Sequence, residues 1–126
     1  MLRTLMIEDN EIFRKTLKRI LTSKFPSMQI EEAADGNEAF SKIEFEPPEL
    51  ILMDINLPGE NGIQLSRKIN EFHPYILIVI ITSHDSPEYR EAASLAGVQY
   101  FISKRSSSTQ DIIGLVESIL SGDALP

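Results

Sequence analysis

Residues 49–62 read ELILMDINLPGENG, an apolar run followed by one carboxylate and a loop that carries Pro58, Gly59 and Gly62. A short apolar run bounded by turn residues is typical of a strand buried in a parallel sheet. In open parallel α/β sheets, chemistry takes place just outside the carboxyl ends of the strands. Asp54 stands where the run meets the loop, so a reactive group is expected there. A solvated or helix-capping aspartate is the structural alternative, and the other strands must decide between the two.

Strand-like segments and helical patterns alternate along the rest of the chain. Strands are expected at residues 4–7, 29–34, 50–53, 76–82 and 98–103, each followed by a helix. Asp9 or Asn10 would cap the first helix, and Ser107 or Ser108 the last. Five such units joined by short connections predict an α/β fold, a doubly wound five-stranded parallel sheet of the flavodoxin-like (βα)5 type. Its strand order, 2-1-3-4-5, is inferred from the fold class.

Composition excludes several classes of function. The 126 residues suit one domain, and the net charge of −7 argues against direct nucleic-acid binding, which depends on neutralising phosphates. The chain has no cysteine and therefore no disulfide or thiolate metal site. Its longest apolar run, residues 75–81, is far too short to cross a bilayer, and the N-terminus lacks the apolar core of a signal peptide. We expect a cytoplasmic domain with no membrane partner.

Acidic residues follow two strands that the predicted order makes neighbours. Glu8 and Asp9 end the first strand and Asp54 ends the third, so three carboxylates would share one cleft. Like charges at such distances raise at least one pKa or recruit a cation. A site of oxygen ligands with room for water suits Mg²⁺. Acids that merely stabilise a helix N-terminus are the alternative for Glu8 and Asp9.

Two further strands bring a hydroxyl and a cation to the same edge. Thr82 ends the fourth strand and Lys104 follows the fifth. Alone, each has an ordinary interpretation, as a β-branched strand residue and a surface lysine. Together they supply what a phosphoryl group on Asp54 would need, because a lysine pairs with phosphate oxygens and a carboxylate is an accepted phosphoryl nucleophile.

The chain resembles the receiver domain of bacterial two-component response regulators from residue 3 to about residue 122. The resemblance is carried by MIEDN, ADGNEA, LILMDINLPGENG, VIITS and AGVQYFISK, in this order and at these separations. It implies that Asp54 is the phosphoacceptor. It also implies a Mg²⁺ site made by Asp54, by Asp9 as a direct ligand, by Glu8 directly or through water, and by the backbone carbonyl of Asn56.

The resemblance assigns the remaining site residues as well. Thr82 is implied as the switch hydroxyl, Lys104 as the phosphate-pairing lysine and Phe101 as the rotating aromatic residue. Many receivers have a cis proline directly after the lysine, whereas Arg105 stands there in this chain. The run Lys-Arg-Ser-Ser-Ser is more similar to receivers joined to helix-turn-helix domains of the nitrate-regulator type. His84 lies near the expected cleft mouth, either as an ordinary surface residue or as one that tunes hydrolysis of the acyl phosphate.

The implied function is a phosphorylation-activated switch and not an enzyme, since it would catalyse only its own phosphorylation and dephosphorylation. A sensor histidine kinase or phosphotransfer protein would be the donor, and the fourth helix, fifth strand and fifth helix would shift to control an output such as transcription. Residues 1–122 would form the receiver domain, and residues 123–126 a tail or the start of a linker to a C-terminal DNA-binding domain. Dimerisation through the first and fifth helices, or through the fourth and fifth, is compatible with the sequence.

Three other functions are alternatives to this one. A flavin- or nucleotide-binding module needs a neutral Gly-, Ser- or Thr-rich loop after the first strand, whereas Glu8 and Asp9 would repel phosphate. An aspartate-nucleophile phosphatase would have its acids in D-x-D spacing on the first strand, which this chain lacks. A degenerate receiver that acts only as a phosphorylation-independent protein-interaction module is the remaining alternative.

Overall fold

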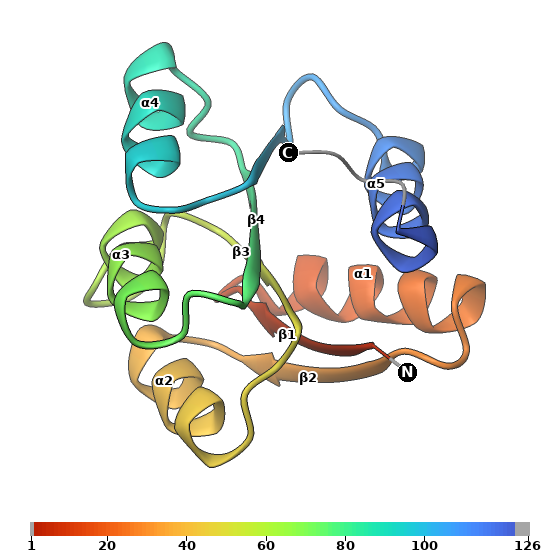
Figure 1. Cartoon of the computed structure of the whole chain (residues 1–126). Coiled ribbons are helices and arrows are strands. Elements are labelled where there is room, and N and C mark those ends of the chain that lie inside the picture. Colours follow the sequence, from red (N-terminus) through yellow and green to blue (C-terminus); the bar gives the residue numbers. More distant parts are fainter. Residues whose placement is uncertain (1, 123–126) are drawn as a thin grey trace.

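The computed structural model describes residues 2–122, in which five parallel strands form one sheet (Figure 1). The strands are β1 (Arg3–Ile7), β2 (Gln29–Ala33), β3 (Leu50–Met53), β4 (Leu77–Thr82) and β5 (Tyr100–Ser103). Their order is β2-β1-β3-β4-β5, and every neighbouring pair is parallel. The predicted fold class and strand order are therefore confirmed. The predicted tail or linker, residues 123–126, lies outside the described residues.

Helices cover both faces of the sheet. They are α1 (Glu11–Lys24), α2 (Gly36–Phe45), α3 (Gly62–Phe72), α4 (Pro87–Leu95) and α5 (Thr109–Ser121). Figure 1 shows α2, α3 and α4 along one face, and α1 with α5 along the other. Each face has its own core, and β3 contributes to both: Leu50 and Leu52 pack with α1 and α5, while Ile51 and Met53 pack with α2 and α3. This two-sided burial is why β3 is continuously apolar instead of alternating.

Side chains at the helix starts settle the open capping assignments. Asn10, not Asp9, caps α1, because its side chain accepts a hydrogen bond from the Phe13 N–H at 3.0 Å. Ser108, not Ser107, caps α5 in a reciprocal capping box with Asp111. Asp9 is therefore not the N-cap of α1.

The fifth strand is shorter than predicted. Val98 does not pair with β4, because its N–H donates to the Ala93 carbonyl near the end of α4. The Gln99 N–H still donates to the Ile78 carbonyl at 3.1 Å, but Gln99 lies outside the strand. The side chain of Gln99 accepts from the Ile78 N–H at 2.9 Å, where a main-chain partner would otherwise stand. β5 therefore begins at Tyr100.

Parallel pairing brings the strand ends to one edge of the sheet. Ile7 is aligned with Met53, and Met53 with Ile80, so the residues after β1 and β3 emerge together beside the last two residues of β4. Thr82 is aligned with Ser103, which precedes Lys104. No helix within residues 2–122 combines the length and apolar character needed to cross a membrane.

Candidate functional site

Two buried carboxylates and one ammonium form the centre of the strand-end edge. Glu8, after β1, is 4% exposed, and Asp54, after β3, is 6% exposed. Lys104 Nζ lies 2.9 Å from Glu8 Oε1 and 3.1 Å from Asp54 Oδ2. One positive charge thus faces two negative charges. The pocket remains anionic, which is the condition that favours an additional cation.

The loop after β3 fixes the orientation of Asp54. Asp54 Oδ1 accepts hydrogen bonds from the main-chain N–H groups of Ile55 at 2.6 Å and Asn56 at 3.3 Å. The Gly62 N–H then donates to the Ile55 carbonyl at 2.7 Å, which turns the loop back at the start of α3. A Cβ on Gly62 would lie 2.2 Å from the Asp54 carbonyl oxygen, so only glycine fits here without a shift of the backbone.

Burial and the lysine have opposing effects on the charges in the pocket. Burial raises the pKa of Glu8 above its ordinary value, and the hydrogen bonds from Lys104 and from the Asn10 N–H offset this effect only in part. Burial alone would lower the pKa of Lys104, but contact with Glu8 and Asp54 outweighs it and the pKa is raised. Lys104 therefore stays protonated at neutral pH and is the resident counter-ion of both acids.

The predicted metal ligands are only partly brought together. Glu8 and Asp54 converge, whereas Asp9 and Asn56 are exposed. Within the described residues, no three acidic, histidine or cysteine side chains are gathered closely enough to hold a metal ion. The donor set nevertheless fits Mg²⁺, which is commonly bound through one or two carboxylates while keeping several waters. The roles of Asp9 and of the Asn56 carbonyl stay predictions.

The predicted switch residues lie on β4 and β5. Thr82 is fully buried, and its Oγ1 accepts a hydrogen bond from the His84 N–H at 3.2 Å. Phe101 is half-buried, with the guanidinium carbon of Arg90 on α4 at 4.6 Å from its ring centroid. The side chain of His84 is exposed, and its imidazole packs beside Tyr89 with the ring centroids 5.6 Å apart.

Serine hydrogen bonds close the turn in which many receivers have proline. Ser103 Oγ accepts from the Arg105 N–H at 3.1 Å and from the Ser106 N–H at 3.3 Å. No peptide bond among the described residues is cis, so the bond between Lys104 and Arg105 is trans. Lys104 thus reaches the pocket without the cis peptide.

Sequence reasoning missed two residues that contact this centre. The ring centroid of Phe13 lies 4.0 Å from Lys104 Nζ, and Arg14 Nη1 donates to the Glu8 carbonyl at 2.7 Å. Both are on α1, where periodicity marks Phe13 as an apolar-face residue and Arg14 as a solvated one. Their spacing from the strand ends was the one available signal, since the first turn of a helix after a strand lies beside that strand's end.

Comparisons with known proteins agree with this geometry. Residues 4–117 match the family model for the response regulator receiver domain. Among curated proteins, oxygen regulatory protein NreC of Staphylococcus carnosus is 29% identical, over 97% of this chain and 56% of that protein. Transcriptional regulatory protein DegU of Brevibacillus brevis is 27% identical, over 94% and 48%. The chain therefore spans about half the length of these relatives.

Solved structures give the same result. A LuxR-family two-component response regulator from an Aurantimonas species aligns with a TM-score of 0.87 and 29% identity, covering 97% of this chain and 86% of that one. The signal receiver domain of the putative response regulator NarL from Mycobacterium tuberculosis aligns with a TM-score of 0.84 and 26% identity, covering 96% and 97%. With the family match over residues 4–117, these likenesses show that the chain belongs to the response regulator receiver domain family.

Proposed function

We propose that this domain is a phosphorylation-activated switch in which Asp54 accepts a phosphoryl group from a histidine kinase or phosphotransfer protein. One observation carries the proposal: a single lysine ammonium contacts both buried strand-end acids, at 2.9 Å from Glu8 and 3.1 Å from Asp54. A carboxylate held beside a cation at a strand end has the setting that a phosphoryl acceptor requires. Membership of the receiver family supports the same assignment.

In the transfer step, an Asp54 carboxylate oxygen attacks phosphorus as the bond between phosphorus and the donor imidazole nitrogen breaks. The electron pair of that bond leaves with the imidazole, and a mixed anhydride remains on Asp54. Lys104 can shift from the carboxylate to the new phosphoryl oxygens without leaving the pocket. Thr82 would supply a hydroxyl donor, because its present bond with the His84 N–H uses the oxygen as an acceptor and not the hydroxyl proton.

The proposed cofactor is Mg²⁺, held by Glu8 and Asp54 with Asp9 and the Asn56 carbonyl as further ligands. When bound, it would neutralise charge on the transferring phosphoryl group. The chain's own contribution is the orientation of these oxygens. Asp54 is fixed by two loop N–H groups, and Glu8 Oε2 accepts from the Asn10 N–H at 3.1 Å.

The proposed output is a shift of α4, β5 and α5. Phosphorylation would draw the Thr82 hydroxyl toward Asp54, and Phe101 would leave its present place against Arg90 to fill the vacated space. Such a shift requires contacts that differ between two states, and these two residues change theirs. The name of the relative DegU, a transcriptional regulatory protein, favours transcription as the output. We further propose that a DNA-binding domain in a longer chain carries this output and that the protein assembles as a homodimer.

The test is phosphorylation of Asp54→Asn beside wild type, with a low-molecular-weight acyl phosphate as donor and Mg²⁺ present. We expect a base-labile label on wild type and none on the variant. Asp35→Asn is the matched control, because it changes an aspartate that caps α2 outside the pocket and an asparagine can still cap. Equal labelling of Asp54→Asn and wild type would remove Asp54 from this role. An unlabelled wild type would favour the protein-interaction module.

A further inference from the structure

Arg14 on α1 joins strand β2 to the residue that follows β1 through one guanidinium. Its Nε donates to Glu32 Oε1 on β2 at 2.8 Å, and its Nη1 donates to the main-chain carbonyl of Glu8 at 2.7 Å. The side chain is only 13% exposed. A planar guanidinium that bonds two acceptors at once has little freedom left, so it fixes the position of one acceptor relative to the other.

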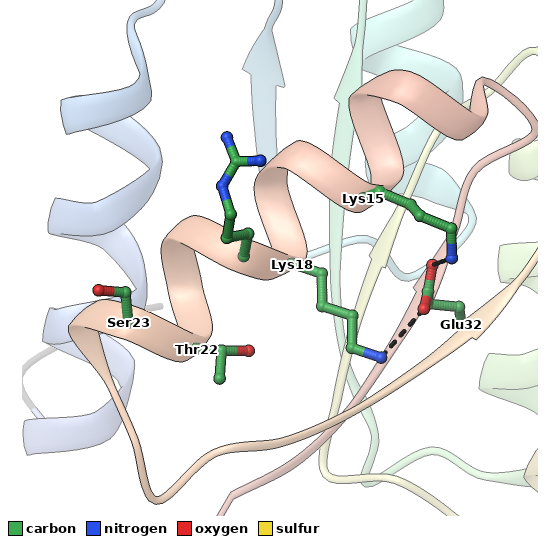
Figure 2. A pocket seen from close by; sticks show the side chains of 6 residues that line it. Lys15, Lys18, Thr22, Ser23 and Glu32 are labelled. Carbon is green, nitrogen blue, oxygen red and sulfur yellow. Dashed lines mark hydrogen bonds and ion pairs between the residues drawn. The ribbon is translucent and has the colours of Figure 1, made fainter.

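Glu32 is held firmly enough to serve as the anchor for Arg14. Besides Arg14, Lys18 at 3.0 Å and Lys15 at 3.4 Å contact its carboxylate, as Figure 2 shows for the two lysines extending from α1. Lys42 on α2 donates to the Glu32 carbonyl at 2.5 Å. The hydrogen bond from Arg14, foremost among these contacts, lowers the pKa of Glu32 to about 2.

The three α1 cations differ in what else they reach. Lys15 and Lys18 line a groove open to solvent on the outer side of α1, with Arg19, Thr22 and Ser23 (Figure 2). Arg14 alone among the three also bonds the Glu8 main chain within the described residues. All three cations therefore contact Glu32, but only Arg14 among them also bonds the Glu8 main chain beside the acidic pocket. Substitutions of Arg14 and Lys18 can thus be compared directly.

The Glu8 carbonyl is the point from which the loop between β1 and α1 departs. The Glu8 N–H is bonded to the Ala33 carbonyl of β2 at 3.0 Å, so with Arg14 both main-chain groups of Glu8 are fixed. From this fixed main chain its carboxylate reaches Lys104 and the Asn10 N–H. We propose that Arg14, anchored by Glu32, is a positioning residue that holds Glu8 and the following acid in register for cation binding. This rests on the proposed function only in naming Mg²⁺ as the cation.

The experiment compares Arg14→Met with Lys18→Met in Mg²⁺ binding, measured by calorimetry, and in thermal unfolding. Both variants lose one cation from Glu32, and we expect both to unfold at a lower temperature than wild type. Only Arg14→Met should weaken Mg²⁺ binding, by about tenfold, the usual size of an effect from outside the ligand set. Lys18→Met should bind Mg²⁺ as wild type does. Arg14→Lys keeps the charge without the double contact and should recover only part of the affinity.

Two further measurements keep the proposal testable if Arg14→Met does not fold. Glu32→Gln removes the anchor without changing α1, and should weaken Mg²⁺ binding in the same direction by a smaller factor. Amide chemical shifts of residues 8–10 should change in Arg14→Lys and Glu32→Gln but not in Lys18→Met, whether or not Mg²⁺ binds. Unaltered chemical shifts and unaltered Mg²⁺ affinity in Arg14→Lys and Glu32→Gln would overturn the role of Arg14. Failure of wild type to be labelled by the acyl phosphate would overturn the proposed function instead. The chemical shifts of residues 8–10 would still test the role of Arg14.

Discussion

Ser103 Oγ donates a hydrogen bond to Asp85 Oδ2 across 2.5 Å, and this bond joins the end of β5 to the loop between β4 and α4. The same hydroxyl oxygen accepts from two N–H groups of the turn that follows Lys104. The bond from Ser103 is the main reason that the pKa of Asp85 lies below its ordinary value. One buried serine therefore ties the segment that carries Thr82 to the segment that carries Lys104.

Replacing Ser103 by alanine should loosen this connection. The Arg105 and Ser106 N–H groups would lose their acceptor, and we expect the free energy of unfolding to fall by about 1–3 kcal/mol. Urea unfolding of Ser103→Ala beside wild type measures the change. Asp85→Asn keeps an oxygen that can accept from Ser103, so it should cost less than Ser103→Ala. A larger loss in Asp85→Asn would contradict this ranking.

A methyl group at Gly62 should disturb the loop that orients Asp54. The new Cβ would lie 2.2 Å from the Asp54 carbonyl oxygen and 2.9 Å from the Ile55 Cα, both main-chain atoms that cannot simply rotate away. We expect Gly62→Ala to lose about 1–3 kcal/mol of stability, as overpacked sites do, and to be phosphorylated more slowly.

Gly114 provides the matched control for that substitution. It lies inside α5, where an added Cβ would meet no atom within 4 Å. Gly114→Ala should stabilise the protein by about 0.5–1 kcal/mol, because alanine is the better helix former. Urea unfolding should thus give opposite signs for two chemically identical substitutions. A stabilised Gly62→Ala would show that the loop relaxes freely.

The sequence could predict the fold and the meeting of Glu8, Asp54 and Lys104 because both follow from strand periodicity and from the direction of parallel strands. The order of the strands needed the fold class as well, since no local pattern encodes which strand is the neighbour of β1. The choice between Asp9 and Asn10 as cap stayed open because both side chains can accept the same N–H bond. The start of β5 was misplaced because Val98 is as strand-like as its successors, and its bond to Ala93 is a tertiary feature.

Contacts between charged residues of different elements were not predictable. Arg14 and Glu32 look like ordinary surface charges in the sequence, and only the packing of α1 over β1 and β2 brings them to 2.8 Å. Phe13 satisfies the apolar periodicity of α1 whether or not Lys104 lies against its ring. Because the local pattern already explains each of these residues, the sequence gives no sign of their contacts with other elements. Those contacts can be seen only in the folded structure.

Acid should remove the contribution of Glu32 to stability. Its pKa falls from 4.5 to about 2 on folding, so the ionised group stabilises the native state above pH 4.5, and this contribution is lost as the pH falls toward 2. The charges around it are those of Arg14, Lys15 and Lys18, with Lys42 on its main-chain carbonyl. Urea midpoints of wild type and Glu32→Gln should therefore differ most at pH 7 and converge as the pH falls toward about 2. A difference that is constant with pH would mean that Glu32 contributes through packing and not through its charge.

Removing the Lys104 ammonium should make the domain depend on a divalent cation. In Lys104→Met, Glu8 and Asp54 would stay buried without the positive charge that now lies 2.9 Å and 3.1 Å from them, at a cost on the order of a few kcal/mol. Mg²⁺ would then meet no competing ammonium and should bind more tightly. Because a ligand of the native state stabilises it more when its affinity is higher, the rise in unfolding temperature with Mg²⁺ should be larger than in wild type. Thermal unfolding across a Mg²⁺ titration measures this, with Lys24→Met, a change of an exposed lysine at the end of α1, as the control that should behave as wild type. An equal Mg²⁺ response in Lys104→Met and wild type would mean that lysine and metal do not compete for Glu8 and Asp54, and the cation would have to bind elsewhere.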